Sequence, residues 1–215
     1  MQERVYFFEL AKDMGIQGME LPPKELPKPA GEAAMVHPNV WRKDGGEKLL
    51  QWLEERYHPG DIFEYDGHGD CWLMLAVMHQ LRGCDIRTYI GAGFDRTLPI
   101  TAYQIGGVPQ ESQPCTFTVE ESGDDVLLTV RLKPDGTPFD LPFGEIIAPE
   151  IPAGKNIFVR LEGRHLLFTF PVALTYGERC NTIVMDYAGE CFCAVSNSEE
   201  IHVGDLVENP FGAST

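Results

Sequence analysis

The residues with the clearest chemical potential lie in one short stretch, "YDGHGD", at positions 65–70. Two glycines, two carboxylates and a histidine share it, and the apolar run "CWLMLAVMHQL" follows at once. A Gly-x-Gly turn that leads into a helix exposes backbone N–H groups and the positive end of the helix dipole, which favours phosphate or another anion. The candidate ligand-binding residues here are Gly67, His68, Gly69 and Asp70.

The same turn also has a purely structural interpretation. Asp70 stands at the N-cap of the expected helix, where its carboxylate would satisfy the N–H groups that a phosphate would use. A lone Gly-x-Gly is also compatible with a tight corner between a strand and a helix. A ligand-binding turn and a self-capped corner therefore both stay open.

His79 lies near the far end of the same expected helix. As a functional group it would be a general base or a phosphate contact. As a structural group it would stabilise the carboxyl end of the helix dipole. Arg82 follows at the helix exit, where its guanidinium could make a forked contact with phosphate or remain a solvated charge.

Metal binding and redox chemistry have weaker signals. His58, Asp61, His68 and Asp70 offer nitrogen and oxygen ligands of the kind that Mn²⁺ accepts, but their spacing matches no metal motif. The cysteines of "GECFCAV" lie at strand spacing without a Cys-x-x-Cys pair, which favours two small core residues. We expect no required cofactor and no dedicated metal site, with Mn²⁺ as an option.

Composition limits the class of partner. A formal net charge of −16, from 17 basic and 33 acidic side chains, argues against a broad basic surface for duplex DNA. No stretch is long and apolar enough to span a membrane, and six cysteines without disulfide-type spacing are typical of a reducing compartment. We expect a cytoplasmic protein in which a local pocket holds any anionic ligand.

Hydrophobic periodicity predicts the elements that position these groups. An amphipathic helix is expected at 47–57, after a loop at 36–46, and a helix too uniformly apolar for a surface is expected at 71–81. The segment 166–176 fits either a strand or a helix. The predicted strands lie at 4–10, 61–67, 86–94, 98–106, 116–122, 126–132, 155–163, 181–189, 190–196 and 202–208.

The sequence also contains an internal repeat. A shift of 96 positions places Gly67 on Gly163 and Cys84 on Cys180. Around both anchors the expected order is strand, glycine turn, apolar helix and strand, which favours a helix at 166–176.

We therefore predict an α+β fold of two tandem half-domains, 1–110 and 111–215, with the segment 108–114 as the best linker. Each half would be a small β-sheet with one long buried helix, and the two would pack as a pseudo-dimer. The first half carries an inserted helix at about 45–57, within an insertion at 36–58.

These motifs resemble a known family, the small CRISPR-associated type III accessory proteins that act as cyclic oligoadenylate ring nucleases and are also described as manganese-dependent RNA exonucleases. The first half supplies "GHGDCWL", followed by a histidine on the helix. The second half supplies "TIVMDYAGECFCAVSNS" and "HVGDLVE". The resemblance covers residues 113–208 in order and spacing, and residues 4–105 more loosely.

The resemblance implies binding of cyclic oligoadenylate or short RNA in antiviral defence, and cleavage by attack of a ribose 2′-hydroxyl on the neighbouring phosphodiester. It implies that His79 is the base, that Asp95 orients it, and that Arg96 or Arg82 neutralises the phosphorane. No metal is obligatory on that route. Two further ligand-binding residues are expected in the second half, Arg164 and Asp186.

The second half departs from the family's strand motif of acid, proline and arginine. Asp186 is present, but Ala188 stands where the arginine is expected and Asn197 stands where the neighbouring strand carries a histidine. This copy is therefore expected to be catalytically impaired, so at most one composite site could react. The alternatives are a non-catalytic binder of cyclic nucleotides and an interaction module with a degenerate site; a metal-dependent hydrolase ranks lower. Assembly into a homo-oligomer is a further possibility.

Overall fold

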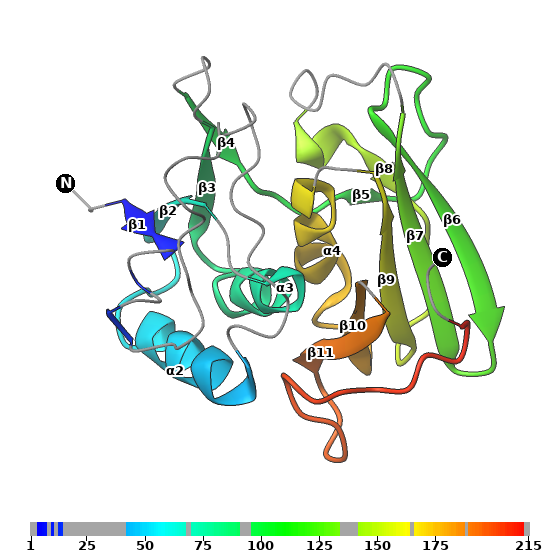
Figure 1. The fold of residues 1–215 in the computed structure, drawn as a ribbon. Coiled ribbons are helices and arrows are strands. Elements are labelled where there is room, and N and C mark those ends of the chain that lie inside the picture. The colour runs from blue at the N-terminus through cyan, green and yellow to red at the C-terminus, as the bar shows by residue number, and fades with distance from the viewer. Residues whose placement is uncertain are drawn as a thin grey trace, which may run out of the picture.

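The structure is a computed structural model in which strands form two main sheets with helices between them (Figure 1). This mixed architecture confirms the predicted α+β class. In the part of the chain that is described, no helix has the length and apolar character needed to cross a membrane. The described residues are 4–7, 10, 13–14, 42–67, 70–90, 96–133, 142–163, 166–187 and 189–212.

The first sheet has the strand order β1-β2-β3-β4. Its strands β1 (Val5–Tyr6), β2 (Ile62–Asp66) and β3 (Asp85–Ile90) are parallel, and β4 (Arg96–Pro99) runs antiparallel to β3. Helix α3 (Cys71–Gln80) connects β2 to β3, because parallel neighbours need a crossover.

The second sheet has the strand order β11-β10-β9-β7-β6. Its three inner strands, β7 (Asp125–Leu132), β9 (Asn156–Glu162) and β10 (Thr182–Tyr187), are parallel. The edge strands β6 (Cys115–Ser122) and β11 (Glu190–Ser196) are antiparallel to their neighbours. A single 3₁₀ turn η2 (Leu166–Phe168) and helix α4 (Phe170–Tyr176) connect β9 to β10.

A small parallel sheet lies between these two. It pairs β5 (Gln104–Ile105) with β8 (Ile147–Ala148), which follows the 3₁₀ turn η1 (Phe143–Glu145). The segment that connects β5 to β6 is the predicted linker. Its residue Gln113 is buried.

The same unit occurs in both main sheets: two parallel strands, a crossover helix and an antiparallel strand at the edge. Backbone hydrogen bonds at its base match as well. Gly60 N–H donates to Gly83 O, and Gly154 N–H donates to Arg179 O, both at 2.8 Å. This order agrees with the repeat found in the sequence, while the relation of the halves as a pseudo-dimer stays a prediction.

Helix α3 is buried on every side. Residues 71–78 are all buried, so the expectation of a helix covered all round is confirmed. It packs against α2, against α4 and against strands β10 and β11 of the other sheet, and Figure 1 shows α3 beside α4 in the centre of the molecule. The core is therefore shared by both halves of the chain.

Helix α2 (Arg42–Glu54) corrects the predicted loop at 36–46, because it begins before residue 47 and includes two glycines. Glycine lowers helix propensity, but here a close approach requires it: a Cβ on Gly46 would lie 2.6 Å from the Trp72 ring. Leu49 and Leu53, both fully buried, anchor the helix on the core. Tertiary packing therefore overrides the local preference.

Three other predictions are settled by the structure. The ambiguous segment 166–176 is helical, with Pro171 in the first turn of α4. The strand predicted at 4–10 was too long, since β1 ends at Tyr6 and the described residue that follows, Phe7, is helical. The strand predicted at 202–208 is wrong, because only an isolated bridge joins Leu206 to β11.

The contact between α2 and α3 predicts the effect of Gly46→Ala. Alanine favours a helix over glycine by about 1 kcal/mol, yet we expect a net loss of about 1–3 kcal/mol in the free energy of unfolding, because the new methyl group collides with Trp72. Urea denaturation measures this loss. In Trp72→Phe, which lacks the colliding ring atoms, the same Gly46→Ala change should cost less; equal costs in both backgrounds would contradict the packing argument.

Candidate functional site

The turn that opens α3 starts from Gly67, whose φ of +74° is a left-handed conformation that glycine adopts without strain. His68 and Gly69, the next predicted ligand residues, lie outside the described residues. Asp70 is 2% exposed and occupies the N-cap position, but its side chain makes no capping hydrogen bond. The prediction that the Asp70 carboxylate caps the helix is therefore wrong, although Asp70 does occupy the N-cap position.

The electrostatics of this helix start oppose an incoming anion. Burial, followed by the neighbouring Asp70 carboxylate, raises the pKa of Cys71 to about 12. A phosphate at this position would lose its hydration and face the same carboxylate. Helix α3 carries no lysine or arginine that would offset the Asp70 carboxylate.

The start of α3 lies against the carboxyl end of the second sheet. Trp72 stacks on Phe192 of β11, with ring centroids 5.9 Å apart. Burial and then the Cys71 thiol raise the pKa of Tyr187, the last residue of β10. The predicted turn of the first half and the predicted acidic strand of the second half are thus brought together, which the sequence repeat alone did not indicate.

Asp186, the predicted acid of β10, sits in a buried polar cluster. Its Oδ2 accepts a hydrogen bond from Arg160 Nε at 2.7 Å and another from Asn209 Nδ2 at 3.2 Å. Arg160 Nη2 also donates to Gly212 O at 2.8 Å. The Asp186 side chain is fully buried and that of Arg160 is 17% exposed, so this ion pair is largely desolvated.

The C-terminal segment 203–212 covers this cluster. Val207 N–H donates to Cys191 O at 2.9 Å, and the Phe211 ring packs edge-on against Phe158 at 5.8 Å. Burial, followed by Asp186, raises the pKa of Cys191 to about 12, so this thiol is no nucleophile near neutral pH. Asp186 Oδ1 is buried without a hydrogen-bond partner among the described residues.

His79 lies at the interface between α3 and α4. Its Nδ1 is buried, and a Cβ on Gly177 of the facing segment would collide with its ring. Burial and then the positive charge of Arg82 lower the pKa of His79. Arg82 itself pairs with Glu178 at 2.9 Å on the surface.

The predicted catalytic residues are not brought together where the structure describes them. His79 is near the carboxyl end of α3, and hence near the start of β3, whereas Arg96 pairs with Ile90 at the end of β3. These positions are at opposite ends of the unit. Asp95 and Arg164 lie outside the described residues.

Asn197, which stands where the resemblance expects a histidine, has a structural role. Its Nδ2 donates to Gly177 O and to Cys180 O, each at 2.8 Å, and so satisfies carbonyl groups after α4. An amide that donates twice to backbone carbonyls explains this residue without catalysis.

Metal ligands do not cluster in the described residues, where no group of three His, Cys, Asp or Glu side chains could hold an ion. Asp61 Oδ2 instead accepts the His58 backbone N–H at 2.8 Å in an exposed turn. The predicted option of Mn²⁺ stays untested, since His68 is among the residues not described.

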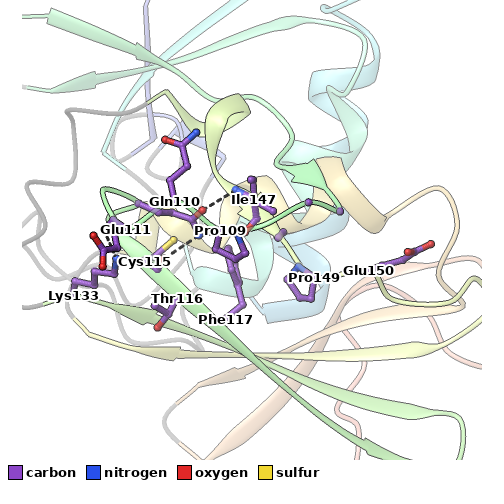
Figure 2. A pocket seen from close by; sticks show the side chains of 14 residues that line it. Pro109, Gln110, Glu111, Cys115, Thr116, Phe117, Lys133, Ile147, Pro149 and Glu150 are labelled. Atoms are coloured by element: carbon purple, nitrogen blue, oxygen red, sulfur yellow. Dashed lines mark hydrogen bonds between the residues drawn. The ribbon is translucent and has the colours of Figure 1, made fainter.

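A groove of about 650 Å³ lies away from these residues, between β6, β8 and the linker, and Figure 2 shows its lining. Its walls include Phe117, Ile147 and Ala148, and its charged groups are Glu111, Glu150 and Lys133. No predicted site residue that the structure describes lines it. Sequence reasoning missed this region, because Gly106, Gly107 and Gln113 form no recognisable motif.

Comparison of the chain with protein-family models, with curated proteins and with solved structures found no match.

The Arg160–Asp186 pair predicts unequal costs for its two truncations. Arg160→Leu leaves a buried carboxylate without its cation and should lower the free energy of unfolding by about 3 kcal/mol. Asp186→Asn should cost less, because Arg160 keeps the Gly212 carbonyl and some solvent contact. Urea denaturation of both single variants and of the double variant tests this. Costs that simply add would show that the pair is not coupled.

The environment of His79 predicts a pH dependence of stability. Because its folded-state pKa lies below the ordinary 6.5, the unfolded chain takes up its proton first and stability falls as pH falls through that value. Between about pH 7.5 and pH 5.5, His79→Gln should lose less stability than the wild type, the difference being at most about 1.4 kcal/mol per pH unit. The exposed His58→Gln is the control; the same slope in all three proteins would contradict the burial of His79.

Proposed function

We propose that the chain is a ring-nuclease-like protein of type III CRISPR defence that binds cyclic oligoadenylate without turning it over efficiently. The observation that supports this proposal is the recurrence of two parallel strands, a crossover helix and an antiparallel edge strand in both main sheets. Two units of this order are what the resemblance to the family implies.

The proposed ligand site is the junction at which the turn after β2 meets the end of β10. Gly67 and Asp186 belong to the family-like motifs of the two halves, and the contacts of Trp72 with Phe192 join the elements that carry them. Backbone N–H groups of the turn would bind phosphate, and adenine bases would stack on Tyr187 and Phe192, which are half-buried at the same junction, because Trp72 is fully covered. Because the carboxylates of Asp70 and Asp186 lie at this junction, we expect only modest affinity for an anionic ligand.

Weak or absent turnover follows from the arrangement of the reactive groups. Cleavage by a 2′-hydroxyl needs a base within hydrogen-bond reach of that hydroxyl and a cation at the phosphorane. His79 is buried against α4, and Arg96 lies at the other end of the unit. His79 and Arg96 therefore cannot act together on one phosphodiester.

The remaining parts of the proposal concern location and cofactors. All six cysteines are free thiols, which supports a cytoplasmic location. Binding through backbone groups needs no metal, so Mn²⁺ should leave the affinity unchanged. Short linear RNA shares the phosphates and bases of the ring and is the natural competitor.

Thermal shift with cyclic tri-, tetra- and hexa-adenylate tests the proposal, followed by chromatography for linear products with and without Mn²⁺. We expect one ring to raise the Tm by several degrees at a concentration of about 100 times its Kd, a smaller shift with linear tetra-adenylate, and no products. No shift with any ring would refute ligand binding, and rapid appearance of linear products would refute the loss of turnover.

A matched pair of glycine variants locates the site. Gly67 and Gly123 both have left-handed φ values, +74° and +61°, and both have open space where the Cβ of a larger residue would lie. Asparagine tolerates this conformation, so both changes should fold. Gly67→Asn should reduce the ligand-induced shift by more than about half because it adds bulk at the junction, whereas Gly123→Asn, in the β6–β7 hairpin, should leave it unchanged.

A further inference from the structure

Strand β6 is an edge strand whose outer side is open in the described residues. It pairs with β7 alone, and Cys115 O faces away from β7, because it accepts a hydrogen bond from Gln113 Nε2 at 3.0 Å. Hydrogen bonding alternates along an antiparallel pair, so the backbone groups of Phe117 and Val119 face outward too. Among the described residues, no other backbone group reaches them.

The side chain of Gln113 already makes hydrogen bonds to backbone groups at this edge. Its Oε1 accepts the Ile147 N–H at 3.0 Å, and its Nε2 donates to Ile147 O at 3.2 Å and to Cys115 O. The buried side-chain amide of Gln113 thus joins the edges of β6 and β8. It makes the hydrogen bonds that one peptide group of an added strand would make at this position. Gln113, Cys115 and Ile147 all belong to the lining of the groove.

The groove has an apolar wall and exposed apolar rim. Phe117, Ile147 and Ala148 line it. Beside it, Val108 is 85% exposed and Val119 is 36% exposed. An extended segment could place every second side chain against this apolar surface.

The charges around the groove are unbalanced. Glu111 and Glu150 line it, and its one lining ammonium, Lys133, donates to Glu111 O at 2.6 Å. Glu120 and Glu121 continue the negative charge along the exposed part of β6. A cationic ligand is therefore favoured over an anionic one.

We propose that this groove binds an extended, lysine- or arginine-rich peptide segment of a partner protein, which adds a strand to the free edge of β6. A second copy of this chain is the disfavoured occupant, because pairing β6 with β6 would place two copies of the acidic residues Glu120 and Glu121 in one interface. The groove is separate from the proposed nucleotide site, so either proposal can fail without the other.

The probe is a fluorescein-labelled pool of heptapeptides with Lys or Arg at alternate positions and mixed apolar residues between them. Fluorescence anisotropy should detect saturable binding to the full chain. A pool of the same apolar residues with Glu in place of the cations should bind at least about tenfold more weakly. Equal binding of both pools, or binding of neither, would overturn the proposal.

Two pairs of variants test the mode of binding. Val119→Pro removes an outward N–H without removing a β6–β7 hydrogen bond, so it should fold and weaken binding by about tenfold or more, whereas Val119→Thr keeps the N–H and should bind within about twofold of the wild type. Glu111→Gln with Glu150→Gln should weaken binding by roughly fivefold. The control with the same change in net charge is Glu199→Gln with Glu200→Gln, two exposed acids elsewhere, which should have no such effect.

Hydrogen exchange separates strand addition from general attraction of charges. Bound peptide should slow exchange of the Phe117 and Val119 amides by at least about tenfold. Binding without this protection, or equal binding by the Pro and Thr variants, would overturn the proposal. A dimer in sedimentation that Val119→Pro dissociates would overturn it in favour of a second copy.

Discussion

The burial of α3 on all sides is the constraint on which the rest of the structure depends. A helix with the sequence "CWLMLAVMHQ" has no face suited to water, and one sheet can cover only one side of it. The remaining sides are covered by α2, by α4 and by strands of the second sheet. The two halves are therefore held together by a helix that belongs to the first and is largely buried by the second.

The same burial limits the chemistry of the residues that looked most reactive. Desolvation lowers the pKa of His79 at one end of α3 and raises the pKa of Cys71 at the other. Both shifts favour the neutral form, so neither group carries a charge that could attract a ligand near neutral pH. A histidine on an apolar helix is thus better explained by the packing of two helices than by general base catalysis.

The sequence predicted the parts of the fold that repeat local patterns, and it failed where distant contacts decide. Alternation predicted the strands at 116–122 and 126–132, which are β6 and β7, and the repeat resolved 166–176 as a helix. No local pattern could show that Gly46 lies in a helix, because the reason is the ring of Trp72 in another element. Likewise, Asp186 was recognised from its motif, but its partner Arg160 lies on a neighbouring strand and could be identified only from the pairing register.

Several arginines in the described part of this acidic chain already pair with carboxylates, and this affects what the protein can recognise. Arg82 pairs with Glu178, Arg131 with Glu162 and Arg160 with Asp186. An anionic ligand has to compete with these carboxylates or rely on backbone N–H groups, and both routes limit its affinity. An extended cationic segment meets no such competition at β6, where the strand edge supplies hydrogen bonds and the acidic surface attracts its charge. The charge distribution of the protein therefore opposes the binding of a cationic segment at the edge of β6 less than the binding of an anionic ligand.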